Sequence, residues 1–188
     1  VDLIFHKKVS DFVITFYIIY MIFASLIGSV FYLYNLTNWY DKLAHSIFGY
    51  VGGIIGLYVV CKLSNINSQK IAFTMLVCFA VSLACGAVWE IWEFSSDMLF
   101  HQQAQGLPLE VITGQYVTPV NDTMFDLICN FGGALVFCLH LFIHKKTNKN
   151  LIMGSIIKDF TTPAKTPQQP QPVEEKNEEE NTNKKEEE

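Results

Sequence analysis

The chain has 188 residues, of which 51% are hydrophobic and 14% aromatic, a composition that is high for a soluble domain and ordinary for a membrane protein. The net charge of −5 says little about partners, because residues 174–188 alone hold eight Glu and three Lys, and the rest of the chain is neutral. Arg is absent and the Lys residues are scattered, so the sequence excludes a nucleic-acid-binding surface.

Four apolar stretches follow a lead-in at residues 1–11, and each is long enough to cross a bilayer, which takes about 20 residues. We predict a transmembrane domain at 12–144, with spans at residues 12–34, 41–61, 71–94 and 123–144. Backbone groups in lipid must be hydrogen-bonded within their own segment, so these spans should be helices. The sequence therefore predicts an all-α bundle, and because it begins at Val1 we expect residues upstream of it.

The connecting segments differ in length and character. The loop at residues 95–121 contains two Gly and two Pro, which break helices, together with apolar residues, so we expect it to rest on the membrane face. The juxtamembrane segment 145–160 carries apolar residues four apart, which is typical of a short amphipathic helix: Ile152, Ile156 and Phe160. Residues 161–188 are rich in Pro and Gln and then in Glu and Lys, and we expect them to be disordered.

Lysine placement predicts the orientation of the spans. Seven Lys residues flank one side of the predicted bundle, namely Lys7, Lys8, Lys62, Lys70, Lys145, Lys146 and Lys149. The other side carries only Lys42. By the positive-inside rule, the lysine-rich side and both termini are cytoplasmic.

Ionisable residues gather at the outer ends of three predicted spans. They are Asp41 and His45 on one span, Glu90, Glu93 and Asp97 on the next, and Asp122 and Asp126 on the last. Residues three, four or seven apart share one face of a helix, so each set forms a stripe. Charged groups at membrane depth are costly and usually mark function, so these stripes are the candidate site.

Small residues continue the same faces toward the membrane interior. They are Gly49, Gly53 and Gly56 after His45, Gly86 before Glu90, and Gly132, Gly133 and Ala134 after Asn130. Small residues allow membrane helices to approach closely. We therefore expect three tightly packed helices beneath the polar residues.

The predicted chemistry of this group is that of a divalent metal site. Six carboxylates cannot all remain charged alone, so either several of them hold protons or a cation sits among them. A set of carboxylates and imidazole suits Zn²⁺, Mn²⁺, Mg²⁺ or Fe²⁺. The candidate ligands are His45, Glu90, Glu93, Asp97 and Asp126.

Three carboxylates are candidates for acid–base or orienting roles, namely Asp41, Glu90 and Asp122. Asp41 is also a candidate to orient His45. Structural roles remain as alternatives, because Asp41 and Asp122 could cap helix N-termini and Asp97 could be solvated. Glu90 and Glu93 are the hardest to explain structurally, since Val, Trp, Ile and Phe flank them.

Three motifs in order carry a family resemblance: Asp41-Lys-Leu-Ala-His45, then Trp89-Glu-Ile-Trp-Glu-Phe94 with Asp97, then Asp122-Thr-Met-Phe-Asp-Leu-Ile128 with Gly132-Gly133-Ala134. Over roughly residues 39–137 the chain resembles the YjdF-type integral membrane proteins of bacteria, and more distantly VanZ-like membrane proteins. The resemblance implies a multi-pass protein of the bacterial cytoplasmic membrane. It implies no reaction.

Three functions fit these observations, and the sequence alone does not decide whether the chain is an enzyme. The first is a metal-dependent hydrolase acting on a lipid or lipid-linked envelope substrate at the outer leaflet. The second is a component of a cation- or proton-coupled transporter. The third is a non-catalytic envelope or assembly factor. Membrane lipids are the expected partners, and a homo-oligomer is left open.

Overall fold

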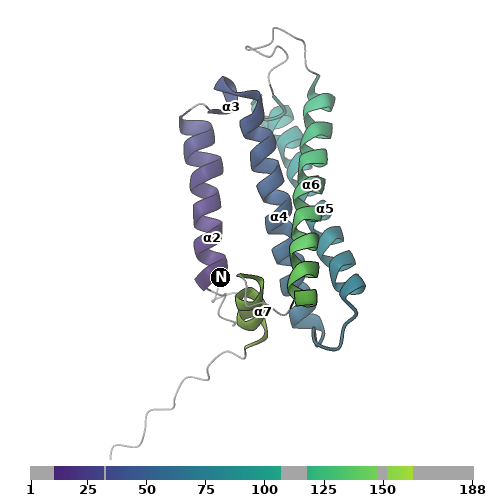
Figure 1. Ribbon diagram of the computed structural model, residues 1–188. Coiled ribbons are helices and arrows are strands. Elements are labelled where there is room, and N and C mark those ends of the chain that lie inside the picture. Colours follow the sequence, from purple (N-terminus) through teal and green to yellow (C-terminus); the bar gives the residue numbers. More distant parts are fainter. Residues whose placement is uncertain (1–10, 32, 107–117, 148–151, 163–188) are drawn as a thin grey trace, which may run out of the picture.

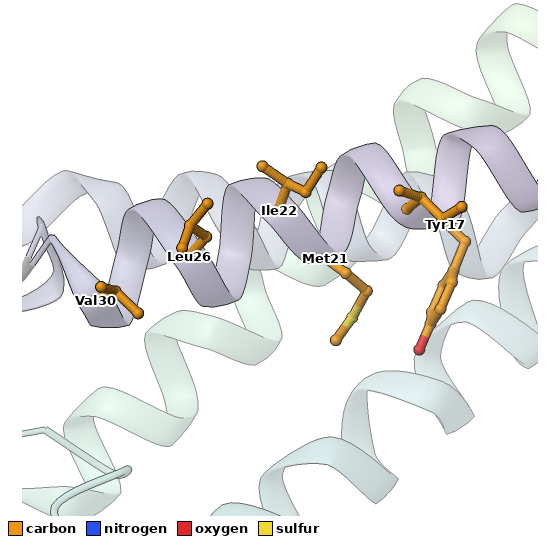
Figure 2. Close-up of a pocket in the computed structure, with 6 residues that line it drawn as sticks. Tyr17, Met21, Ile22, Leu26 and Val30 are labelled. Carbon is orange, nitrogen blue, oxygen red and sulfur yellow. The ribbon is translucent and has the colours of Figure 1, made fainter.

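The computed structural model describes residues 11–31, 33–106, 118–147 and 152–162, and every regular element within them is a helix. Three long helices stand side by side (Figure 1): α4 (Asn38–Leu63), α5 (Ile71–Phe100) and α6 (Pro119–Thr147). Each contains a segment long and apolar enough to cross a membrane: Trp39–Leu63, Ile71–Phe100 and Pro119–Thr147. The prediction of an all-α transmembrane bundle is confirmed.

The stretch predicted as the first span, residues 12–34, consists of three pieces. They are α2 (Asp11–Met21), the π-helix η1 (Ile22–Val30) and the short α3 (Leu33–Leu36). The break follows from local packing, because the ring of Tyr34 lies where a Cβ on Gly28 would be. Figure 1 shows α2 beside α4, away from α5 and α6. The apolar part of this stretch, Ile14–Val30, is shorter than the three long helices.

The long helices extend past their predicted ends. α5 continues to Phe100, six residues beyond the predicted end at 94, so part of the predicted outer loop is helical. α7 (Ile152–Thr161) forms within the segment predicted to be amphipathic and buries Met153, Ile156 and Phe160. The predictions for residues 1–10, 107–117 and 163–188 fall outside the described residues.

Glycines bring α4 into backbone contact with both neighbouring helices. A Cβ on Gly49 would collide with the backbone carbonyl of Asn130 in α6, and a Cβ on Gly56 would lie 2.5 Å from the Cα of Cys78 in α5. A Cβ on Gly133 of α6 would likewise collide with the backbone carbonyl of Ser46 in α4. The close packing predicted from the small residues is confirmed at these glycines and fixes the register of the three polar stripes. The prediction is wrong for Gly132, because a Cβ there would have nothing within 4 Å.

The end of the bundle near α7 is closed by apolar side chains. Leu57, Phe137 and Leu141 are almost completely buried there, and Phe160 of α7 packs onto the same cluster. The ammonium of Lys62 donates a hydrogen bond to the carbonyl of Phe160 (2.7 Å) and holds α7 across this end (Figure 1). The core of this half is therefore mainly apolar, with Thr74 and the hydrogen-bonded pair Tyr50–His140 (2.7 Å) as polar members.

Tyr40 attaches the N-terminal helices to the bundle. Its side chain is 3% exposed, and its hydroxyl donates a hydrogen bond to the carbonyl of Phe23 in η1 (2.6 Å). The ring also packs against the rings of Phe23 and Tyr34, with centroids 4.7 and 5.3 Å apart. η1 therefore depends on this one residue for a specific polar contact with α4.

The Tyr40→Phe variant is expected to loosen η1 without disturbing α5. Loss of the hydroxyl removes one buried hydrogen bond, worth about 1 kcal/mol. Hydrogen exchange followed by mass spectrometry should show faster exchange in Ile22–Val30 and unchanged exchange in Ile71–Phe100. Uniformly faster exchange in both helices would contradict this local role.

Candidate functional site

Six of the seven predicted site residues meet at one end of the bundle. α4 contributes Asp41 and His45, α5 contributes Glu90 and Glu93, and α6 contributes Asp122 and Asp126, all at the end opposite α7. Two overlapping groups have ligand atoms within 4.8 Å of one another: Asp41, His45 and Asp126, and His45, Glu90 and Glu93. His45 belongs to both groups.

Lys42 is a central member of this site, although its position in the sequence predicted only the orientation of the spans. Its ammonium lies 3.0 Å from Asp41 Oδ2, 2.6 Å from Asp122 Oδ1 and 2.8 Å from Asp126 Oδ1. One cation from α4 therefore links two aspartates of α6. The sequence feature that could have predicted this role is a lysine next to an aspartate at the start of an otherwise apolar span. We call these residues the polar cluster: Asp41, Lys42, His45, Glu90, Glu93, Asp122 and Asp126.

The imidazole of His45 divides the polar cluster into two halves. Nε2 lies 3.5 Å from Asp41 Oδ1 and 3.9 Å from Asp126 Oδ1, on the side of Lys42. Nδ1 lies 3.5 Å from Glu90 Oε1, on the side of α5. The side chain is 6% exposed, so its ring nitrogens must find their partners within the protein.

Glu90 is the least satisfied member of the polar cluster. It is 5% exposed, and neither carboxylate oxygen has a hydrogen-bond partner of good geometry among the described residues, although the Thr123 side chain lies near. Glu93 is better satisfied, because Trp89 Nε1 donates a hydrogen bond to its Oε1 (2.8 Å). Burying a carboxylate without partners costs free energy. Among the described residues, the Glu90 half of the cluster has no cation that plays the part of Lys42.

Asp97 lies outside both groups and holds the start of the following loop. Its Oδ1 accepts a hydrogen bond from the backbone N–H of Ala104 (2.7 Å), and its Oδ2 accepts one from Gln105 (3.0 Å). The Gln105 side chain in turn donates to the hydroxyl of Thr123 on α6 (2.9 Å). Asp97 thus ties the loop to the two helices that carry the acidic residues, and its predicted role as a ligand stays a prediction.

A second polar layer lies beneath the cluster. Asn130 is fully buried, its Nδ2 donates to the carbonyl of Ser82 (3.3 Å), and its Oδ1 has no partner among the described residues. The hydroxyl of Ser82 donates to the carbonyl of Gly49 (2.6 Å). Two turns deeper on α6, Phe137 is fully buried, so this polar layer is followed by the apolar core.

Two tyrosines of the N-terminal helices also border the polar cluster. Tyr20 of α2 and Tyr34 of α3 lie close enough to Asp41 and Glu93 to interact with their charges. Tyr20 is positioned by ring contact with Phe48 of α4, with centroids 6.0 Å apart. Neither tyrosine was predicted, because the sequence of an apolar stretch does not show which way a tyrosine side chain points.

Three tryptophans mark the level of the polar cluster along the helices. Trp39, Trp89 and Trp92 are 61%, 44% and 60% exposed on α4 and α5, next to the residues that carry the acidic groups. Tryptophan is enriched where a membrane meets water. The polar cluster lies at the same level of the helices as these exposed tryptophans.

A family model described as "Predicted membrane protein (DUF2238)" matches residues 5–147, which is more than half of the chain. The chain belongs to this family. With its three apolar helices, this DUF2238 protein is an integral membrane protein. No curated protein and no solved structure matched the sequence. The finer likeness to YjdF-type and VanZ-like proteins stays a prediction.

Proposed function

We propose that this membrane protein binds a divalent metal ion between His45, Glu90 and Glu93 and hydrolyses a lipid or lipid-linked substrate at the membrane surface. The observation that carries the proposal is the buried Glu90 carboxylate, which faces His45 Nδ1 with no hydrogen-bond partner of good geometry. A ring nitrogen and a carboxylate that face each other in this way would both bind a cation placed between them.

The spacing of these groups suits a metal ion. Two ligand atoms that are each about 2.1 Å from a tetrahedral ion lie about 3.4 Å apart. His45 Nδ1 and Glu90 Oε1 are 3.5 Å apart, which is too long for a good hydrogen bond between them. Glu93 supplies a third ligand atom within 4.8 Å of both. Imidazole with two carboxylates is a set that Zn²⁺, Mn²⁺ and Fe²⁺ accept.

The other ring nitrogen of His45 has the partner that a metal-binding histidine needs. Such a histidine usually donates its second ring N–H to a carboxylate, which fixes the tautomer and orients the ring. Asp41 Oδ1 lies 3.5 Å from Nε2, so a side-chain shift of about 0.3–0.5 Å would bring it within hydrogen-bond distance of that proton. This arrangement favours Asp41 as the orienting residue and Glu90 as a ligand rather than as an acid or base.

The reaction proposed for the site is hydrolysis. A divalent ion held there would supply a Lewis acid that activates water and polarises a carbonyl or phosphoryl oxygen. Asp122 is 15% exposed and Asp41 is 25% exposed, so both lie at the rim where a substrate would enter. The substrate class is chosen from the setting, because exposed tryptophans beside the site suit the membrane surface, where lipids and lipid-linked molecules reach it. We place the rim at the outer face of a bacterial cytoplasmic membrane, following the lysine distribution.

Elemental analysis of the detergent-purified protein tests the metal site. The wild-type protein should carry about one divalent ion per chain. Glu90→Gln and His45→Ala should weaken binding by more than the roughly 10- to 100-fold that loss of an outer partner costs. Asp97→Asn is the matched control, because it alters a carboxylate of the same helix that hydrogen-bonds the loop, and it should retain the ion. A wild-type protein that binds no divalent ion, even on titration, would remove the proposal.

Hydrolysis needs its own test. Proteoliposomes made with total membrane lipid should release a water-soluble product, followed by mass spectrometry, with wild-type protein and not with Glu90→Gln. Release by both proteins would place the reaction elsewhere.

A second candidate, a non-catalytic assembly factor, has one observation in its favour. Lys42 joins Asp41 of α4 to Asp122 and Asp126 of α6, which is what a structural lock would do. Under that function, neutral replacements in the Glu90 half should change stability and leave metal content untouched. A transporter is less favoured, because Leu57, Phe137 and Leu141 fill the core of the far half of the described bundle, where Tyr50 and His140 form a polar pair beside Phe137.

A further inference from the structure

We propose that the ammonium of Lys42 occupies the position of a second divalent cation, so that removing it turns the Asp41, Asp122 and Asp126 half of the polar cluster into a second metal site. This inference deepens the proposed function and rests on it for the first ion. It also says why the site would hold a single ion in the wild-type protein.

The ammonium is bound as a metal ion would be. It lies 2.6–3.0 Å from oxygens of three carboxylates that come from two helices. Asp126 is 1% exposed, so its carboxylate is already fixed within the protein. Mg²⁺ binds carboxylate oxygens at about 2.0–2.1 Å, so the three carboxylates need to move inward by about 0.5–1 Å to hold an ion of this size.

Each half of the polar cluster places a pair of carboxylates beside His45. One group of possible ligands contains Asp41 and Asp126, the other contains Glu90 and Glu93, and His45 stands between them. The first half is served by an ammonium from the chain, whereas the Glu90 carboxylate in the second half has no hydrogen-bond partner of good geometry among the described residues, with Thr123 nearby. The two halves are therefore alike in their donors and differ in the cation that serves them.

The charge of the polar cluster favours another cation over an anion. Asp41, Asp122 and Asp126 share the single ammonium of Lys42, so the carboxylates of this half outnumber the cation that serves them by three to one. Replacing Lys42 with a neutral residue of similar length removes one positive charge from this half. A divalent ion bound in its place would bring two. The vacated position is already lined by oxygen atoms, which Mn²⁺ and Mg²⁺ accept.

Manganese titration compares the variants directly. Equilibrium dialysis against Mn²⁺ with elemental analysis should find one more ion per chain in Lys42→Met than in the wild-type protein. Lys42→Arg keeps the positive charge and should match the wild type. Lys62→Met is the matched control, because Lys62 binds the Phe160 carbonyl at the opposite end of the bundle, and it should also match the wild type.

A spectroscopic readout locates the additional ion. Two Mn²⁺ ions on either side of one imidazole should give an exchange- or dipole-broadened electron paramagnetic resonance spectrum in Lys42→Met, whereas the wild-type protein should give the spectrum of an isolated ion. Where the wild-type protein holds one ion, a second ion in Lys42→Met without this broadening would mean that it binds outside the polar cluster, which overturns the inference.

The outcomes separate this inference from the proposed function. A wild-type protein without metal together with one ion in Lys42→Met removes the proposed function and supports the role of Lys42. Equal metal content in the two proteins overturns the inference, whatever that content is. If Lys42→Met does not fold, the double variant Lys42→Met/Asp122→Asn reduces the repulsion and still offers Asp41, His45 and Asp126, and the same comparison applies to it.

Discussion

The Gly133→Ala variant is expected to lose about 3 kcal/mol of stability, the upper part of the range for overpacking a tight core. A Cβ at this position would collide with the backbone carbonyl of Ser46 and would lie 3.0 Å from the backbone nitrogen of Tyr50. Backbone atoms cannot move aside as a flexible side chain can, so α6 must shift away from α4. Because Ser46 directly follows His45, the shift would also separate His45 from Asp126.

The neighbouring glycine supplies the matched control for this prediction. A Cβ on Gly132 has nothing within 4 Å, and alanine is favoured over glycine in a helix by up to about 1 kcal/mol. Gly132→Ala should therefore unfold in detergent at the same temperature as the wild type or slightly above it, whereas Gly133→Ala should unfold well below. Equal unfolding temperatures for the two variants would show that α4 and α6 are not in backbone contact.

The sequence predicted the convergence of the acidic residues because helix geometry is periodic. Glu90 and Glu93 share a face of α5, Asp122 and Asp126 share a face of α6, and apolar residues of membrane length leave few alternatives to helices. The small residues on the same faces predicted which sides of the helices meet. The structure confirms both the helices and the close packing.

The position of Lys42 could not be derived in the same way. Periodicity says which residues share a face of one helix, but it does not give the rotation of α4 relative to α6. That rotation depends on where backbones meet, as at Gly49 and Asn130. A lysine has a long side chain that can reach from the edge of a stripe, so its partners on α6 are visible only in three dimensions.

Asp97 shows a second limit of the sequence pattern. It lies seven residues after Glu90 and belongs to the same predicted stripe, yet its carboxylate accepts hydrogen bonds from Ala104 and Gln105. Near a helix end, backbone N–H groups of the following turn compete for a carboxylate. The loop residues that make this turn lie outside the stripe, so helical spacing alone could not anticipate the contact.

Without metal, Lys42→Met is expected to be the least stable of the single-charge variants. Removing one partner from a buried ion pair costs about 3–5 kcal/mol, because the remaining charges lose their compensation. Asp126 is 1% exposed and cannot turn to water, while Asp41 and Asp122 are partly exposed and can. The cost should therefore fall near the lower end of that range, and thermal unfolding in a chelator would measure it.

The response of this variant to metal distinguishes a site from a lock. If the three aspartates can bind a divalent ion, saturating Mn²⁺ should raise the unfolding temperature of Lys42→Met by much more than that of the wild type, because a ligand that binds only the folded state stabilises it. Lys62→Met should respond as the wild type does, since its partner lies at the other end of the bundle. A Lys42→Met protein that stays equally unstable with and without Mn²⁺ would mean that these carboxylates serve only to join α4 to α6.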